Sequence, residues 1–179
     1  MNEEDYLKKS LEYGASKSFI VNPKMDILFH ERVRLICANS CGNYGVKLTC
    51  PPNIPPINYE KAIKEYSLGI LVVVENNFIN DEDFTIKRKS STNNLHNILL
   101  QLEKDAFSNG HLYTTSFIGG SCKLCDVCGT TCKKPSLSRI PLEATGVDVV
   151  ETMKNFLIDL KFPVKKYNNF KRVGLFLIE

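Results

Sequence analysis

The chain has 179 residues, 43% of them hydrophobic, which suits one globular domain with a single core. Lys and Arg number 23 against 20 Asp and Glu, so the net charge is only +3. That balance excludes a disordered polyelectrolyte and a protein built to coat nucleic acid, and a nucleic-acid partner is not expected.

Two stretches bear on where the protein works. Residues 1–5 are acidic, whereas a secretion signal starts basic and continues apolar. The longest strongly apolar run, residues 68–74, is far shorter than the roughly 20 residues of a membrane helix. We therefore expect a cytoplasmic protein without a membrane span.

The first third of the chain predicts short elements. Residues 3–13 form a predicted helix with acids at its start, and Gly14 can close it. A short strand is expected at 18–21. Residues 25–38 fit strand alternation only in pieces, and the prolines at 51–56 predict a stiff, extended connection.

Strands and helices then alternate. Asn58 caps a predicted short helix that ends near Tyr66. Residues 69–75, almost all Ile, Leu and Val, predict a strand buried on both faces. Polar residues at 76–93 predict an exposed loop, and apolar residues recur at helical spacing over 95–106.

The last part predicts two strands and one helix. Residues 111–118 and 171–178 are predicted strands, and Asp148 starts a helix between them. The buried face of that helix comprises Val149, Met153, Phe156 and Leu160. The order predicts an α/β sandwich, one domain over residues 1–179, compatible with a ferredoxin-like topology.

Seven cysteines form two groups, and an odd number cannot pair completely. A reducing cytoplasm also argues against a disulfide framework. Loop 37–52 carries three cysteines and loop 119–135 carries four, which are Cys37, Cys41 and Cys50, and Cys122, Cys125, Cys128 and Cys132. We expect all seven to be metal ligands.

The second group has the spacing C-x2-C-x2-C-x3-C, which resembles the ligand string of bacterial ferredoxins around a 4Fe-4S cluster. Zinc sites also use C-x2-C pairs, but they place a longer stretch between the pairs. The spacing therefore favours iron–sulfur, with zinc as the alternative. Lys133 and Lys134 separate the last cysteine from Pro135, unlike the ferredoxin pattern, so whether Cys132 binds the same cluster as its three neighbours stays open.

Three glycines in this loop are candidate cofactor-binding residues. Gly119, Gly120 and Gly129 can adopt positive φ and direct backbone N–H groups at cluster sulfur. The alternative is that they only close turns.

The first group offers three thiolates, which would leave one iron of a 4Fe-4S cluster open. Water, a substrate or a side chain such as His30, Tyr44 or a carboxylate can occupy that position, and an open iron can act as a Lewis acid. A three-thiolate zinc site or a partly structural role explains these cysteines equally well.

Together these motifs resemble a known family. The segments 41–45 (CGNYG), 50–52 (CPP), 119–125 (GGSCKLC) and 143–148 (EATGVD) are similar to a prokaryotic family of cysteine-rich predicted metal-binding proteins of unknown function. The resemblance covers roughly residues 30–178. It implies metal binding through these cysteines and no particular reaction.

Other polar residues are weaker candidates. Arg139, Glu143 and Asp148 can line a site, although Asp148 suffices as a helix cap and Glu143 can simply pair with Arg139. His96 is expected at the surface, and His111 is a weak ligand candidate. A basic run near the C-terminus is a solvated face or a docking site for an acidic redox partner; it contains Lys161, Lys165, Lys166, Lys171 and Arg172.

Three functions follow from these patterns. The first is an iron–sulfur protein with one or two 4Fe-4S clusters that passes electrons to a redox protein partner. The second is an enzyme in which one cluster feeds electrons to an open-iron site that binds a small-molecule substrate. The third is a zinc-stabilised structural or interaction module. The sequence favours iron–sulfur chemistry and leaves turnover of a substrate open.

Overall fold

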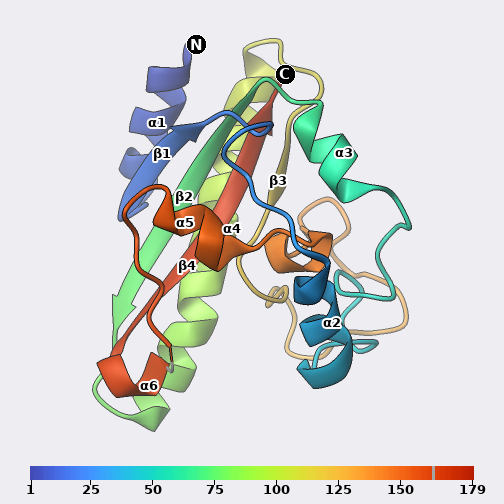
Figure 1. Ribbon diagram of the computed structural model, residues 1–179, viewed down its shortest axis with the longest axis vertical. Helices are drawn as coiled ribbons and strands as arrows, with labels where there is room; N and C mark the ends of the chain where they lie inside the picture. Colours follow the sequence, from blue (N-terminus) through green and yellow to red (C-terminus); the bar gives the residue numbers. More distant parts are fainter. Residues whose placement is uncertain (163) are drawn as a thin grey trace.

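The computed structural model describes residues 1–162 and 164–179. A four-stranded sheet forms its centre, in the order β1-β2-β4-β3 (Figure 1). The strands are β1 (Lys17–Val21), β2 (Leu68–Asn77), β3 (Thr115–Phe117) and β4 (Asn169–Ile178). All three neighbouring pairs are antiparallel, and β2 pairs with β4 along its full length. β2 and β3 run parallel to each other on either side of β4, and α4 (Asp81–Ser108) joins them, so the sheet contains one split βαβ unit. Helices lie in all three connections between the strands, so the chain order differs from the βαββαβ order of the ferredoxin-like topology.

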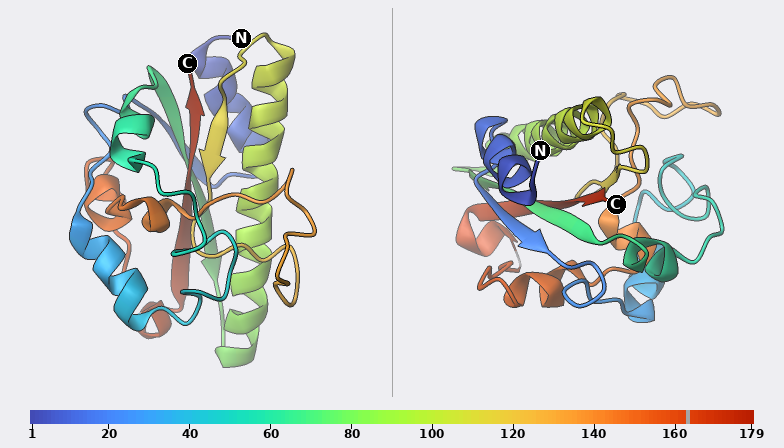
Figure 2. Two further views of the ribbon diagram at one scale, coloured as in Figure 1. Left: turned by 90° about the vertical axis from the view of Figure 1, so that its right-hand side faces the viewer. Right: turned by 90° about the horizontal axis from the view of Figure 1, so that it is seen from above.

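Helices cover both faces of the sheet, as Figure 2 shows. α1 (Glu3–Glu12) and α4 (Asp81–Ser108) pack on one face. α3 (Tyr59–Lys64), α5 (Val149–Lys154) and the 3-10 turn η1 (Leu142–Thr145) pack on the other. α2 (Glu31–Ser40) lies against η1, and α6 (Val164–Tyr167) precedes β4. The predicted single α/β domain is confirmed.

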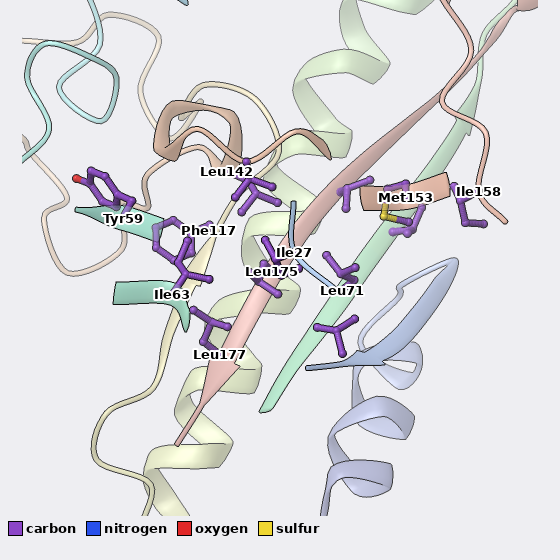
Figure 3. Packing of buried hydrophobic residues seen from close by; sticks show 14 residues of the cluster. Ile27, Tyr59, Ile63, Leu71, Phe117, Leu142, Met153, Ile158, Leu175 and Leu177 are labelled. Carbon is purple, nitrogen blue, oxygen red and sulfur yellow. The ribbon is translucent and has the colours of Figure 1, made fainter. Parts of the chain in front are cut away.

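The strand pattern explains the two cores. On β2, Ile70 and Val72 face α1 and α4, whereas Leu71 and Val73 face the opposite core, which Figure 3 shows in close-up. Because successive side chains alternate between faces, a strand covered on both sides must be apolar throughout. The prediction of a strand buried on both faces is confirmed.

The largest error of the sequence analysis concerns residues 76–93. We expected an exposed loop, but β2 extends to Asn77 and α4 begins at Asp81. The Asn80 side chain accepts a hydrogen bond from the Asp83 amide, and three acids occupy the first turn. α4 therefore spans 28 residues. Its amino-terminal half was missed because few of its residues are apolar.

Smaller differences concern the other elements. Residues 31–40, part of a stretch that fitted strand alternation in pieces, form α2, and β3 is shorter than the strand predicted at 111–118. α5 ends at Lys154, although Phe156 and Leu160 beyond it still pack against the core. Within the described residues, no helix is long and apolar enough to cross a membrane.

One backbone segment, residues 140–148, fixes the starts of both cysteine loops. The Leu142 N–H donates to the Ile118 carbonyl over 2.7 Å, which closes the base of the second loop. The His30 N–H donates to the Gly146 carbonyl over 3.0 Å, just before α2 and the first loop. The start of α2, which leads into the first loop, and the start of the second loop are therefore both bound to this segment.

A polar contact joins α1 to α4. Lys9 Nζ lies 2.8 Å from Asp105 Oδ2, and the Tyr13 hydroxyl donates to the same oxygen. Burial alone would raise the pKa of Asp105, but the hydrogen bonds from Lys9 and Tyr13 lower it. A lowered carboxyl pKa contributes stability above the unfolded-state pKa, and that stability is lost as the pH falls through the folded-state pKa.

We expect Asp105→Asn to lower the free energy of unfolding by about 1 kcal/mol at pH 7 and by less at pH 3. Urea unfolding at both pH values measures this difference. Glu12→Gln, which breaks an exposed pair with Lys8, is the control and should change nothing measurable. If Asp105→Asn lowered the free energy of unfolding equally at pH 7 and pH 3, the stabilising role of the Asp105 carboxylate would be contradicted.

Candidate metal centres

The four cysteines of the second loop surround one small pocket. Cys122, Cys125, Cys128 and Cys132 all line a cavity of about 30 Å³ and are all partly exposed. Burial raises the pKa of the Cys122 thiol, and the nearby Cys125 and Cys132 thiols raise it further, although the Leu124 amide opposes this. Cys132 thus lies with its three neighbours, as a complete four-thiol set requires.

The three cysteines of the first group line a second, larger cavity of about 290 Å³. Cys37 lies on α2, Cys41 is the residue that ends this helix, and Cys50 follows a series of turns. The Gly45 N–H donates to the Pro51 carbonyl over 2.9 Å, which folds the chain back toward Cys41. Burial, together with Cys41, Cys37 and Glu143, raises the pKa of Cys50 to about 11.

The two cavities share a wall. Along residues 121–124, Ser121 and Lys123 line the three-thiol cavity, whereas Cys122 and Leu124 line the four-thiol cavity. The first loop also contributes to both cavities. Its residues 47–49 line the four-thiol cavity, and Cys50 lines the three-thiol cavity. The seven cysteines therefore line two adjacent cavities, one with four thiols and one with three.

A carboxylate completes the surroundings of the three thiols. Glu143, on η1, lines their cavity and accepts a hydrogen bond from the Gly120 amide over 3.2 Å. After burial and the Cys41 thiol, its charge is a further cause of the raised pKa of Cys37. Tyr44 also lines this cavity. His30 is not among the lining residues, and its Nδ1 instead lies 3.0 Å from Asp148 Oδ2.

The remaining weak candidates have structural partners elsewhere. Arg139 pairs with Glu103, so the expected pairing with Glu143 is wrong. Asp148 caps α5 by accepting from the Glu151 amide over 3.0 Å. His96 was expected at the surface but is fully buried on α4, because the side of the helix that it occupies faces the protein interior.

The rings of His111 and Tyr6, on α1, make a T-shaped contact, and the neighbouring Leu112 donates its N–H to Glu179 at the C-terminal end of β4. Figure 1 shows that the chain termini lie at the opposite end of the sheet from the loops beside α2. His111 is therefore not near either group of thiols.

The three loop glycines differ in their roles. At Gly119, an added Cβ would lie 2.5 Å from the Val173 carbonyl oxygen, so only glycine lets the loop lie against β4. Gly120 has φ +74° and donates to Glu143 rather than to a thiol. Gly129 has no positive φ and has room for a side chain. Positive φ is thus confirmed for Gly120 alone.

The basic run near the C-terminus does not form one surface. Lys171 pairs with Glu75 over 3.3 Å, and Lys161 and Lys166 lie over the Tyr167 ring. Arg172 points to the opposite face of β4 and lines the three-thiol cavity. The side chain of Lys165 lies outside the described part of the chain.

Sequence reasoning missed two cationic residues of this cavity, Arg88 and Lys123. Burial lowers the pKa of Lys123, and the charges of Arg88 and Arg172 lower it further. Arg88 was hidden in the predicted loop. The sequence did contain a signal for this helix, because Asn80 followed by three acidic residues is a typical helix start. A helix that begins there contains Arg88.

The donor set suits a metal. Each of the seven cysteines, all of them among the described residues, is a free thiol, and thiolates are the ligands that zinc and iron–sulfur clusters prefer. No three His, Cys, Asp or Glu side chains in the described part of the chain are arranged to hold a single metal ion.

We expect Gly119→Ala to lower the free energy of unfolding by about 1–3 kcal/mol, because the new methyl group meets the β4 backbone. Gly129→Ala is the matched control in the same loop, where the nearest atom is 3.5 Å away, and a change within about 0.5 kcal/mol is expected. Denaturant unfolding of both metal-free variants measures this. Equal losses would show that Gly119 is not needed for close packing.

Comparison with known proteins identifies a family. No curated protein and no solved structure matches the chain. The family model described as predicted metal-binding protein (DUF2284) matches residues 21–178, which include all seven cysteines and Glu143. The chain therefore belongs to this family of predicted metal-binding proteins.

Proposed function

We propose that this protein binds one or two 4Fe-4S clusters and uses them for electron transfer or cluster-based redox chemistry. The observation that carries the proposal is the shared wall between a four-thiol cavity and a three-thiol cavity. Cys122, Cys125, Cys128 and Cys132 would hold one cluster. Cys37, Cys41 and Cys50, with Glu143 as a fourth ligand, would hold the other.

The arrangement of the thiols favours iron–sulfur clusters over zinc. A zinc ion draws four ligands to one point, with sulfur at about 2.3 Å. In a 4Fe-4S cluster each thiolate binds a different iron, so the sulfurs surround a volume. The second loop leaves only two residues between its first and second and between its second and third cysteines, a spacing that suits the second arrangement.

The two sites differ in their ligands and in the size of their cavities. The four-thiol site has a full set of cysteines, which suits a centre that only carries electrons. The three-thiol site combines thiols with a carboxylate and a larger cavity, which suits a position that a substrate can reach. Clusters bound at these sites would supply one-electron transfer.

The outer surface of the four-thiol loop suits contact with a redox protein. Val127, between Cys125 and Cys128, is 79% exposed, and Lys133 and Lys134 are exposed beside it. An apolar side chain near basic ones is suited to a partner with an acidic docking surface. Such a reduced carrier protein would supply the electrons, and a small-molecule substrate would meet the other site.

Metal and acid-labile sulfide analysis of protein produced without oxygen tests the proposal. Two filled sites predict about eight iron and about eight sulfide per chain. Cys50→Ala and Cys125→Ala should each retain about half, since each removes one ligand from a different site. Colourless protein with stoichiometric zinc under the same conditions would overturn the proposal.

Glu143 is tested separately by Glu143→Gln, which keeps a side-chain oxygen for the Gly120 amide but removes the negative charge. We expect this variant to change the electron paramagnetic resonance spectrum of the reduced protein, because the three-thiol site loses a ligand. Glu31→Gln, an exposed change on α2, is the control. An unchanged spectrum in Glu143→Gln would rule out Glu143 as a ligand.

A further inference from the structure

The cavity of the three thiols also gathers three positively charged side chains from separate elements. Arg88 comes from α4, Lys123 from the second cysteine loop and Arg172 from β4. Thr92 and Ser121 add hydroxyl groups. The cavity, about 290 Å³, is therefore rich in cationic hydrogen-bond donors and large enough for a small molecule.

The described residues that line the cavity balance these charges only in part. Among the residues that the structure describes, none of the three cations forms an ion pair. Glu143 is the single acidic residue of the described cavity lining, so three positive charges face one negative charge. Like charges held together repel one another, and an anion between them would relieve that repulsion.

Arg172 is held in place for such a contact. Its guanidinium lies over the Phe170 ring at 5.5 Å, and at Gly120 an added Cβ would lie 3.1 Å from one of its nitrogens. Its Nε is buried and has no hydrogen-bond partner among the described residues. A buried charged donor without a partner is unfavourable, and an oxyanion is the acceptor that matches the guanidinium fork.

The cations and the thiols face the same cavity. Cys37, Cys41 and Cys50 line it together with the three cations, so an anion bound there would lie next to the three-thiol site. A molecule held by its charged group would then present the rest of itself to that site. The cationic group thus resembles a positioning device for a substrate.

We propose that this cavity binds a small molecule carrying a phosphate or carboxylate group through Arg88, Lys123 and Arg172. Binding of the anion needs only these three side chains, whereas its role as the substrate of the three-thiol site rests on the proposed function. The site therefore selects anionic small molecules.

Isothermal titration calorimetry on reduced, metal-free protein at low ionic strength tests the binding. Inorganic phosphate and malonate are separate probes, and the tighter one identifies the group recognised. Arg88→Gln and Lys123→Gln should each weaken binding by about tenfold or more. Lys104→Gln makes the same charge change on α4 outside this cavity and should bind like the wild type.

The proposal is overturned if the wild type binds neither probe, or if Lys104→Gln weakens binding as much as the cavity variants do. The second result would mean that only the overall charge matters. Arg88 and Lys123 are chosen because they are less buried than Arg172 Nε, and thermal unfolding of each variant establishes that it is folded.

The same titration on protein loaded with iron and sulfide without oxygen tests whether the anion binds beside the three-thiol site. Retained binding, with a change in the spectrum of the three-thiol site, supports an anion beside that site. Loss of binding on loading would mean that the cations only balance the charge of the metal centre, which overturns the substrate role. If the protein takes up no iron, the proposed function fails while the metal-free titration still decides anion binding.

Discussion

The hydrogen bonds of residues 140–148 hold both cysteine loops in position. Ile118 pairs with this segment at one end and His30 at the other, so the loops start from a common piece of backbone. Leu142 and Val147 anchor the same segment in the core. Because buried backbone groups must be paired, this arrangement fixes how the two loops lie relative to each other. Cysteines far apart in the sequence become neighbours as a result.

The chemistry of the site follows from that placement. η1 lies within the anchoring segment and brings Glu143 to the three thiols, while the second loop passes between the two cavities. Gly119 lets this loop lie against β4, next to Arg172. A complete set of four thiols thus stands beside an incomplete set with a carboxylate and three cations. In the proposed function, the first arrangement would store an electron and the second would deliver it to a bound anion.

Much of this could be predicted from local patterns. The division of seven cysteines into four and three, the strand buried on both faces and the Asn58 and Asp148 caps all depend on neighbouring residues. Glu143, by contrast, could only be named as a candidate, because its contact with Gly120 joins residues 23 positions apart. The amino-terminal half of α4 was missed because its polar residues hide the helical period, and Arg88 was missed with it. The strand order was likewise invisible, since antiparallel pairing of β2 with β4 depends on the tertiary fold.

The central claim is that two metal centres lie on either side of one wall, residues 121–124. Electron paramagnetic resonance of the reduced protein, prepared without oxygen, tests it most directly, because two paramagnetic centres at close range interact magnetically. We predict a spectrum broadened by this interaction, which Cys50→Ala simplifies to that of one isolated 4Fe-4S cluster. A wild-type spectrum already identical to that of Cys50→Ala would contradict the account.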